Sequence, residues 1–76
     1  MDWRSRIVAD PEVLLGKPVI KGTRISVELV MELLAAGYTP NQIVEQYDHL
    51  TVEDVQLCLA YAKDIIRPER VYLVRG

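Results

Sequence analysis

The sequence predicts a mainly α protein: a three-helix unit of the helix-turn-helix type, homeodomain-like or winged-helix-like. A short N-terminal β-strand and a β-hairpin precede this unit, and a strand at the C-terminus follows it. Two observations predict the fold: three successive segments each begin with a helix-start signal, and very short turns join them. The 76 residues suffice for one domain. We divide that domain into an arm (1–26), a three-helix unit (27–66) and a tail (67–76).

The arm is expected to hold the strands. Residues 6–9 are typical of a short strand, and 19–20 with 23–25 are typical of the two sides of a tight hairpin. Lys21 and Gly22 would form its two-residue turn, with Gly22 supplying a positive φ. Further residues mark turns, tie the hairpin to the helices or end the first helix: Asp10, Pro11, Gly16, Pro18, Thr23, Arg24 and Gly37.

The three helix starts share one pattern. Ser26, Thr39 and Thr51 are the expected N-caps, because their side-chain oxygens can accept hydrogen bonds from first-turn amides. Thr39 with Gln42 makes a capping box, and Thr51 with Asp54 makes a weaker one. The helices are therefore expected near residues 27–36, 40–47 and 52–66.

The apolar pattern of the helices predicts a core and a contact surface. On the third helix the expected core stripe is Val52, Val55, Leu59, Ala62 and Ile66, with Cys58, Tyr61 and Ile65 beside it. The first helix is apolar nearly all round, and a chain this short offers little to bury it in. We therefore expect a homodimer. The alternative is that the hairpin and the tail cover this helix within one chain.

The residues expected at a dimer or partner interface come from three segments. The tail contributes an apolar run without alternation, which is typical of a strand covered on both faces. Leu57 falls on the polar side of the third helix. The complete set is Leu29, Met31, Leu33, Leu57, Val71, Tyr72, Leu73 and Val74.

The net charge of −2 hides three unequal segments. Residues 1–27 hold five basic and three acidic side chains, residues 28–66 hold one basic and seven acidic, and residues 67–76 hold three basic and one acidic. Two basic ends therefore flank an acidic middle, and a function should account for this asymmetry.

Composition argues against catalysis and cofactors. A single cysteine and a single histidine exclude a disulfide framework and offer no zinc cluster or nucleophile–base pair. We expect no enzyme activity, no metal and no cofactor. There is no apolar run of about 18 residues, so no membrane span is expected. The start of the chain lacks a signal peptide, and a cytoplasmic location is expected.

DNA binding receives mixed support. The N-terminal part of the third helix would enter the major groove, where Glu53 and Asp54 oppose phosphates and Gln56 suits base reading. Affinity would otherwise come from the basic arm. The candidate nucleic-acid-binding residues are Arg4, Arg6, Lys17, Lys21, Arg24 and Gln56. The alternative is that the basic residues are ordinary surface charges.

One long motif resembles a known family. The run from Asp10 to Val27, with Gly-Lys-Pro-Val-Ile-Lys-Gly-Thr-Arg at 16–24, resembles the prokaryotic "domain of unknown function 433" family. The similarity continues through Leu-Leu-Ala-Ala-Gly-Tyr-Thr-Pro at 33–40 and Leu-Thr-Val-Glu-Asp-Val at 50–55, and covers about residues 6–62. This sequence departs from the family at Asp48, where a proline is usual, and at Leu57-Cys58, where smaller residues are usual.

The resemblance implies a function. Many members look like antitoxins encoded beside a PIN-like ribonuclease toxin, which they neutralise by direct binding while repressing their own promoter. The expected partners are thus a second copy of the chain, a PIN-like ribonuclease and operator DNA, without a membrane. An acidic, apolar-backed helical surface suits a basic ribonuclease. The alternative is a protein-interaction or scaffold dimer module without a DNA-binding role.

Overall fold

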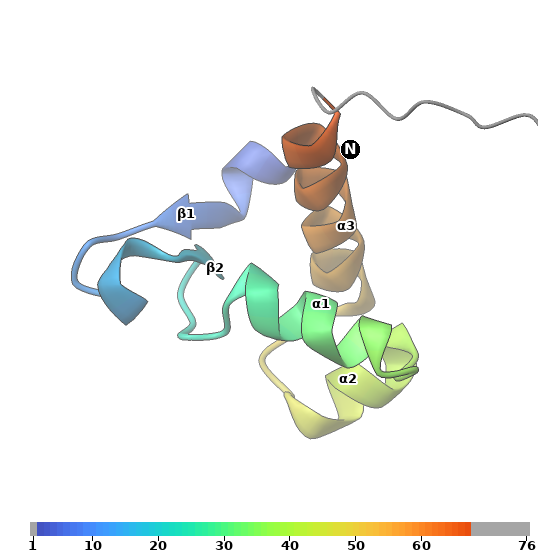
Figure 1. The fold of residues 1–76 in the computed structure, drawn as a ribbon. Helices are drawn as coiled ribbons and strands as arrows, with labels where there is room; N and C mark the ends of the chain where they lie inside the picture. The colour runs from blue at the N-terminus through green and yellow to red at the C-terminus, as the bar shows by residue number, and fades with distance from the viewer. Residues whose placement is uncertain (1, 68–76) are drawn as a thin grey trace, which may run out of the picture.

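The computed structural model describes residues 2–67. Within them the chain forms an N-terminal arm and three α-helices, so the mainly α fold is confirmed (Figure 1). The predicted strand at 71–74 lies outside the described residues. The elements in order are the 3-10 turn η1 (Trp3–Ser5), β1 (Ile7–Ala9), the 3-10 turn η2 (Leu14–Gly16), β2 (Pro18–Ile20), α1 (Val27–Ala35), α2 (Pro40–Gln46) and α3 (Val52–Ile66).

The arm pairs differently from the prediction. β1 and β2 form an antiparallel ladder with Ile7 opposite Ile20. The Lys21–Gly22 turn is present, since the Thr23 amide donates to the Ile20 carbonyl at 3.0 Å and Gly22 has a φ of +80°. The chain after this turn adds only an isolated bridge between Val19 and Ser26. The second side of the predicted hairpin is therefore not a strand, because α1 begins immediately after Ser26.

The helix boundaries follow their predicted caps. The Ser26, Thr39 and Thr51 side chains each accept a hydrogen bond from the backbone amide three residues later. Both capping boxes are formed, including the Thr51–Asp54 box. The α1 helix ends in a Schellman motif, in which Gly37 has a φ of +99° and the Tyr38 amide donates to the Leu33 carbonyl.

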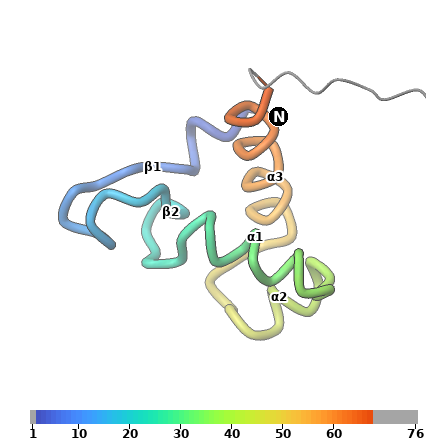
Figure 2. The backbone as a smooth tube through the Cα atoms, in the orientation of Figure 1, coloured from blue at the N-terminus to red at the C-terminus, as the bar shows by residue number. Residues whose placement is uncertain are grey.

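The core lies where α1, α2 and α3 meet the arm (Figure 2). It consists of buried apolar side chains from every one of these elements. They are Ile7, Ile20, Val27, Val30, Ile43, Leu50, Val55 and Cys58.

The predicted phase of α3 is wrong. Val55 is buried, but Val52, Leu59 and Ile66 of the expected core stripe are exposed. The buried face instead contains Leu57, at 4% exposure, next to Cys58. Placing Leu57 on the polar side of the helix was therefore also wrong. Both alternatives have helical spacing, and the position of α1 and β1 against α3 decides between them.

The α1 helix is better covered than its composition suggests. Val27 and Val30 are buried, and Met31 and Leu33 pack against the core while remaining partly accessible. Leu29 is also partly accessible. The chain thus supplies much of the cover that we expected from a second copy. Within residues 2–67, no helix has the length and apolar character needed to cross a membrane.

Candidate functional site

One of the predicted DNA contacts, Arg6, forms an ion pair within the fold near the start of α3. The Arg6 guanidinium donates to both carboxylate oxygens of Asp54, at 3.2 and 3.4 Å. The same carboxylate accepts from the Thr51 amide as part of the capping box. Asp54 is 3% exposed and does not face solvent as predicted. This pair joins the arm to α3, and only Glu53 remains as an outward carboxylate in the first turn.

A second tie joins the arm to the last turns of α3. The Trp3 indole N–H donates to the Asp64 carboxylate at 2.6 Å, and its ring meets the Tyr61 ring edge-to-face at 4.7 Å between centroids. The Arg4 guanidinium lies over the Trp3 ring and forms an exposed ion pair with Asp2. The Arg4 amide, which donates to Asp2, lowers the pKa of that exposed carboxyl group. Arg4 is thereby held at the end of the molecule that carries the C-terminus of α3.

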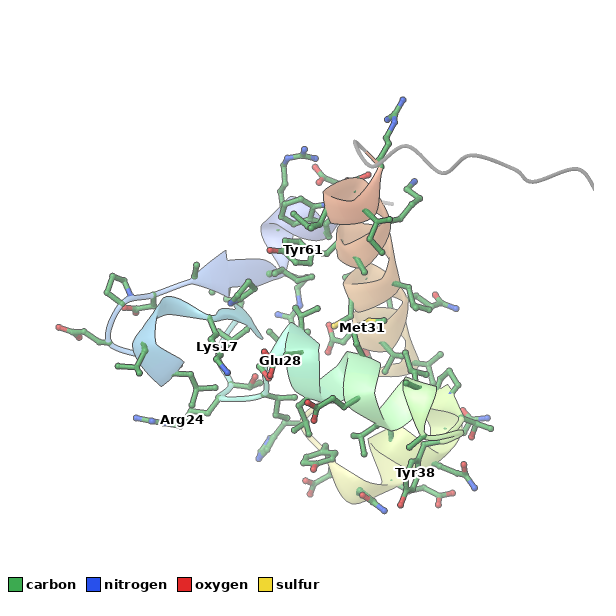
Figure 3. All side chains as sticks on the ribbon, in the orientation of Figure 1. Lys17, Arg24, Glu28, Met31, Tyr38 and Tyr61 are labelled. Atoms are coloured by element: carbon green, nitrogen blue, oxygen red, sulfur yellow. The ribbon has the colours of Figure 1, made fainter. Side chains whose placement is uncertain are left out.

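The remaining basic residues of the arm separate into two kinds. Lys17 lies 3.5 Å from Glu28 at the start of α1 (Figure 3). Lys21 and Arg24 are exposed and form no ion pair within residues 2–67, and Arg24 extends away from the body (Figure 3). Thr23 closes the turn between them, because its hydroxyl donates to the Ile20 carbonyl and accepts from the Ile25 amide. This hydrogen-bonded turn therefore presents two cations that form no ion pair within residues 2–67.

The helical body presents mainly negative charge. Of its seven carboxylates, Asp54 is buried in an ion pair and Asp64 is bonded to Trp3. The others are exposed on α1, α2, the turn that follows and the first turn of α3: Glu28, Glu32, Glu45, Asp48 and Glu53. The acidic middle seen in the sequence is thus an acidic surface, opposed within residues 2–67 by Lys63 on the same helices.

An apolar stripe lies on the outward face of α3. Val52, Leu59 and Ile66 are 36%, 44% and 55% exposed, and their spacing of seven residues aligns them along the helix. Gln56 and Lys63 are exposed on the same face. We call Val52, Gln56, Leu59, Lys63 and Ile66 the outer stripe. The stripe is mainly apolar, whereas a surface that binds DNA is mainly basic.

An apolar groove of about 250 Å³ lies between the start of α1 and the last turns of α3. Figure 3 shows Met31 and Tyr61 on its two sides. Ile65 is 58% exposed there, although it follows Cys58 at helical spacing on the buried side of α3. A single carboxylate, Glu28, stands at its edge. We call this the α1–α3 groove. Its apolar lining is Pro18, Val27, Met31, Tyr61, Ala62, Ile65 and Ile66, so that it meets the outer stripe at Ile66.

Among the described residues 2–67, the non-glycine residues with a positive φ lie in the loop between the strands. Leu14 and Leu15 have φ values of +48° and +57°, a left-handed conformation that leucine rarely adopts. Leu15 is 96% exposed. Left-handed leucines cost about 1–2 kcal/mol each, and such strain persists where the surrounding structure or a function requires it. The loop thus presents an apolar side chain at an energetic cost.

The groups able to do chemistry are few. Cys58 is fully buried, and burial together with the Asp54 carboxylate raises the pKa of its thiol to about 12. Within residues 2–67 no cluster of three His, Cys, Asp or Glu side chains could hold a metal ion. His49 is exposed. Within the described residues, four surfaces are available for contact with a partner: the basic turn (Lys21 and Arg24), the acidic body, the outer stripe and the groove.

Sequence reasoning missed the contacts that join distant segments. Arg6 and Asp54 are 48 residues apart and Trp3 and Asp64 are 61 apart, so no local pattern connects them. The sequence does contain a signal for the groove. Apolar residues on the third helix continue beyond the length that the two shorter helices could cover. The predicted interface residues Val71, Tyr72, Leu73 and Val74 lie outside the described residues.

Comparison with known proteins gives one family and one curated relative. The family model described as "Protein of unknown function (DUF433)" matches residues 7–62. "Uncharacterized protein y4eO" of Sinorhizobium fredii (strain NBRC 101917 / NGR234) is 33% identical over 60 residues, covering 79% of this chain and 27% of the relative. This chain therefore spans about a quarter of that relative's length. No solved structure matches the chain significantly.

Proposed function

We propose, from the premise that this chain belongs to the DUF433 family, that it is an antitoxin-like protein that binds and neutralises a PIN-like ribonuclease. The family description names no function. We propose a ribonuclease as the partner because the sequence resembles a family in which many members look like antitoxins. The observation that carries the binding role is the outer stripe of α3, whose apolar side chains lie on the surface at helical spacing. A stripe of this kind suits a complementary groove on another protein.

The charge around the stripe supports a basic partner. Glu45, Asp48 and Glu53 are exposed on the same helical body, and complementary potentials speed the encounter of two proteins and disfavour wrong partners. An enzyme that cleaves RNA presents positive charge to its substrate, and an acidic surface can occupy the same place. We therefore expect the complex to weaken as salt concentration rises.

Co-expression with the neighbouring open reading frame tests this proposal. The chain should co-purify with the neighbouring product and restore growth that the product alone suppresses. Leu59→Glu should abolish both effects while leaving the circular dichroism spectrum unchanged, because Leu59 is already 44% exposed.

Gln46→Glu is the matched control, since it adds the same charge at an exposed position on α2 away from the stripe. Equal loss of binding in both variants would show that charge, and not the stripe, determines the effect. A neighbouring product that is harmless and does not co-purify would overturn the antitoxin proposal.

A second role, repression of its own promoter as a dimer, is favoured by Lys21 and Arg24. These exposed cations flank a hydrogen-bonded turn, and in a homodimer they would occur twice. The exposed first turns of α3 offer Glu53 and Gln56 and thus only one side chain suited to base reading. We therefore propose contacts that depend mainly on phosphates and are made by the turn.

A gel shift with promoter DNA at about 50 and about 200 mM salt tests the DNA role. Binding should weaken steeply at the higher salt and be lost in the Lys21→Glu/Arg24→Glu variant. Lys63→Glu, at the other end of the molecule, should bind nearly as the unmodified chain does. If the chain does not bind the DNA at low salt, the DNA role is overturned and the alternative, a protein-interaction module without a DNA-binding role, is kept.

A further inference from the structure

We propose that a second copy of this chain packs on the outer stripe, with the two α3 helices antiparallel and Leu59 at the two-fold axis. The inference goes beyond the proposed function, because it concerns the chain alone. A nuclease on the same stripe would exclude the second copy, so the two contacts would alternate. The dimer expected from the apolar character of α1 would use a different face of the molecule.

The spacing of the outer stripe is that of a contact between two helices. Its members at positions 52, 56, 59, 63 and 66 alternate in steps of four and three residues, which keeps them on one face of α3. The opposite face holds the buried side chains of Val55, Leu57 and Cys58. Apolar side chains therefore lie on two faces of the same helix, and the fold of residues 2–67 covers only one of them.

The apolar members of the stripe are symmetric about Leu59, which is the midpoint of α3. When two copies of the helix run in opposite directions and cross at Leu59, Val52 of each copy meets the partner's Ile66. Every apolar position then faces another apolar position, and burying these exposed side chains is favourable. The contact uses the same surface on both copies, so that it closes on a dimer.

The two polar members of the stripe also match in this arrangement. Gln56 and Lys63 lie on opposite sides of Leu59, so that each Gln56 faces the partner's Lys63. The amide oxygen of glutamine can accept a hydrogen bond from the lysine ammonium group. Both residues are exposed, and Lys63 forms no ion pair within residues 2–67. The polar side chains therefore meet each other and not the apolar ones.

Charge along α3 determines the direction of the second helix. Glu53 follows Val52 and Arg67 follows Ile66, so that both flank the stripe on the same side. Both are exposed, and within the described residues neither forms an ion pair. In an antiparallel pair, Glu53 lies beside the partner's Arg67, and symmetry makes this contact twice. A parallel pair would place like charges together at both ends and align the helix dipoles, which is unfavourable.

The oligomeric state of the purified chain is the first test. One helix from each copy makes a small interface, so we expect a micromolar dissociation constant, measured by sedimentation equilibrium between about 1 and about 300 µM. Leu59→Glu should be a monomer throughout this range with an unchanged circular dichroism spectrum, because Leu59 is already exposed. If the unmodified chain is a monomer at every concentration, or if Leu59→Glu still dimerises, the proposal is overturned.

Cysteine crosslinking tests the direction of the helices. Leu59→Cys should link two copies under mild oxidation, because the two side chains meet at the axis. Val52→Cys alone should link poorly, since the two copies of this residue would lie roughly 20 Å apart along the helices. The native Cys58 does not compete because it is buried.

A mixture of Val52→Cys and Ile66→Cys chains completes this test. The mixed dimer should form at least about tenfold faster than either variant links to itself, because association raises the effective concentration of the facing thiols. Fast linking of Val52→Cys to itself would indicate a parallel pair and would overturn the proposed arrangement.

Exchange of the flanking charges tests the ion pairs. Glu53→Arg should weaken the dimer about tenfold at low salt, since it places like charges together at two symmetric contacts, and Arg67→Glu should do the same. The double variant restores opposite charges and should dimerise nearly as the unmodified chain does. Glu32→Arg is the matched control, because it makes the same change at an exposed position on α1.

Equal weakening by Glu53→Arg and Glu32→Arg, without recovery in the double variant, would contradict the pairing. All of these measurements use the chain without a nuclease. A result against the dimer therefore leaves the nuclease proposal standing, and a harmless neighbouring product leaves the dimer standing.

Discussion

The two halves of α3 have similar apolar content and opposite surroundings. In the first half, Val55, Leu57 and Cys58 are at most 4% exposed, whereas in the last turn Ile65 and Ile66 are more than half exposed. The helix has 15 residues, but α1 has nine and α2 has seven. Burial along a helix is therefore limited by the length of its neighbours, and the same residue types become core at one end and contact surface at the other.

The largest expected effect comes from breaking the anchor of the buried half. Asp54→Ala removes the partner of Arg6 and the N3 side chain of the capping box, and we expect it to lower the free energy of unfolding by about 3 kcal/mol. The Arg6 side chain is 41% exposed, so solvent screens part of the ion pair. Urea denaturation measures the change. The neighbouring carboxylate Glu53 is exposed, and Glu53→Ala should cost less than about 0.5 kcal/mol.

Two alanine substitutions one turn apart on α3 compare the stability contributions of a buried and an exposed side chain. Val55→Ala empties part of a fully buried site and should cost about 2 kcal/mol. Leu59→Ala removes more carbon atoms but from a side chain that is 44% exposed, and it should cost about 0.5 kcal/mol. Thermal unfolding of both variants checks this order. A larger cost for Leu59→Ala would mean that the core stripe expected from periodicity is the true one in solution.

Alkaline pH should lower the free energy of unfolding through Cys58, which lies in the buried half of α3. Burial raises the pKa of the Cys58 thiol from an ordinary value of 9.0 to about 12. Below pH 9 both states hold the proton. Between pH 9 and 12 the unfolded chain loses it first, so stability falls by up to about 1.4 kcal/mol per pH unit.

Urea titrations at pH 7 and pH 10 measure this loss, and Cys58→Ala should lack the Cys58 part of it. A thiol reagent offers a second readout, since its rate should follow the rate of opening of the fold. Rapid labelling of the folded chain at pH 8 would contradict the burial of Cys58.

One substitution in the loop between the strands should increase stability. Leu15→Gly relieves a left-handed backbone at a side chain that is 96% exposed and should raise the free energy of unfolding by about 1 kcal/mol. Glycine also loses more entropy on folding, which limits the gain. If Leu15 contacts a partner, the same variant will bind more weakly while unfolding at a higher temperature.

The sequence by itself determined the local structure. The starts of α1, α2 and α3, both capping boxes and the glycine-dependent end of α1 were predicted because each depends on hydrogen bonds between residues at most five positions apart. The family also follows from a continuous motif, which the match over residues 7–62 confirms.

Only the tertiary structure decided which surface each residue serves. Helical spacing admits two core faces on α3, and packing against α1 and β1 selected the one that buries Leu57 and exposes Leu59. Likewise, the sequence places Arg6 among the basic residues of the arm, and only the fold pairs it with Asp54, 48 positions away. Such choices depend on the lengths and positions of distant elements, which no short stretch of sequence encodes. For this reason Lys21 and Arg24, the outer stripe and the groove can be recognised as separate exposed surfaces only in the folded chain.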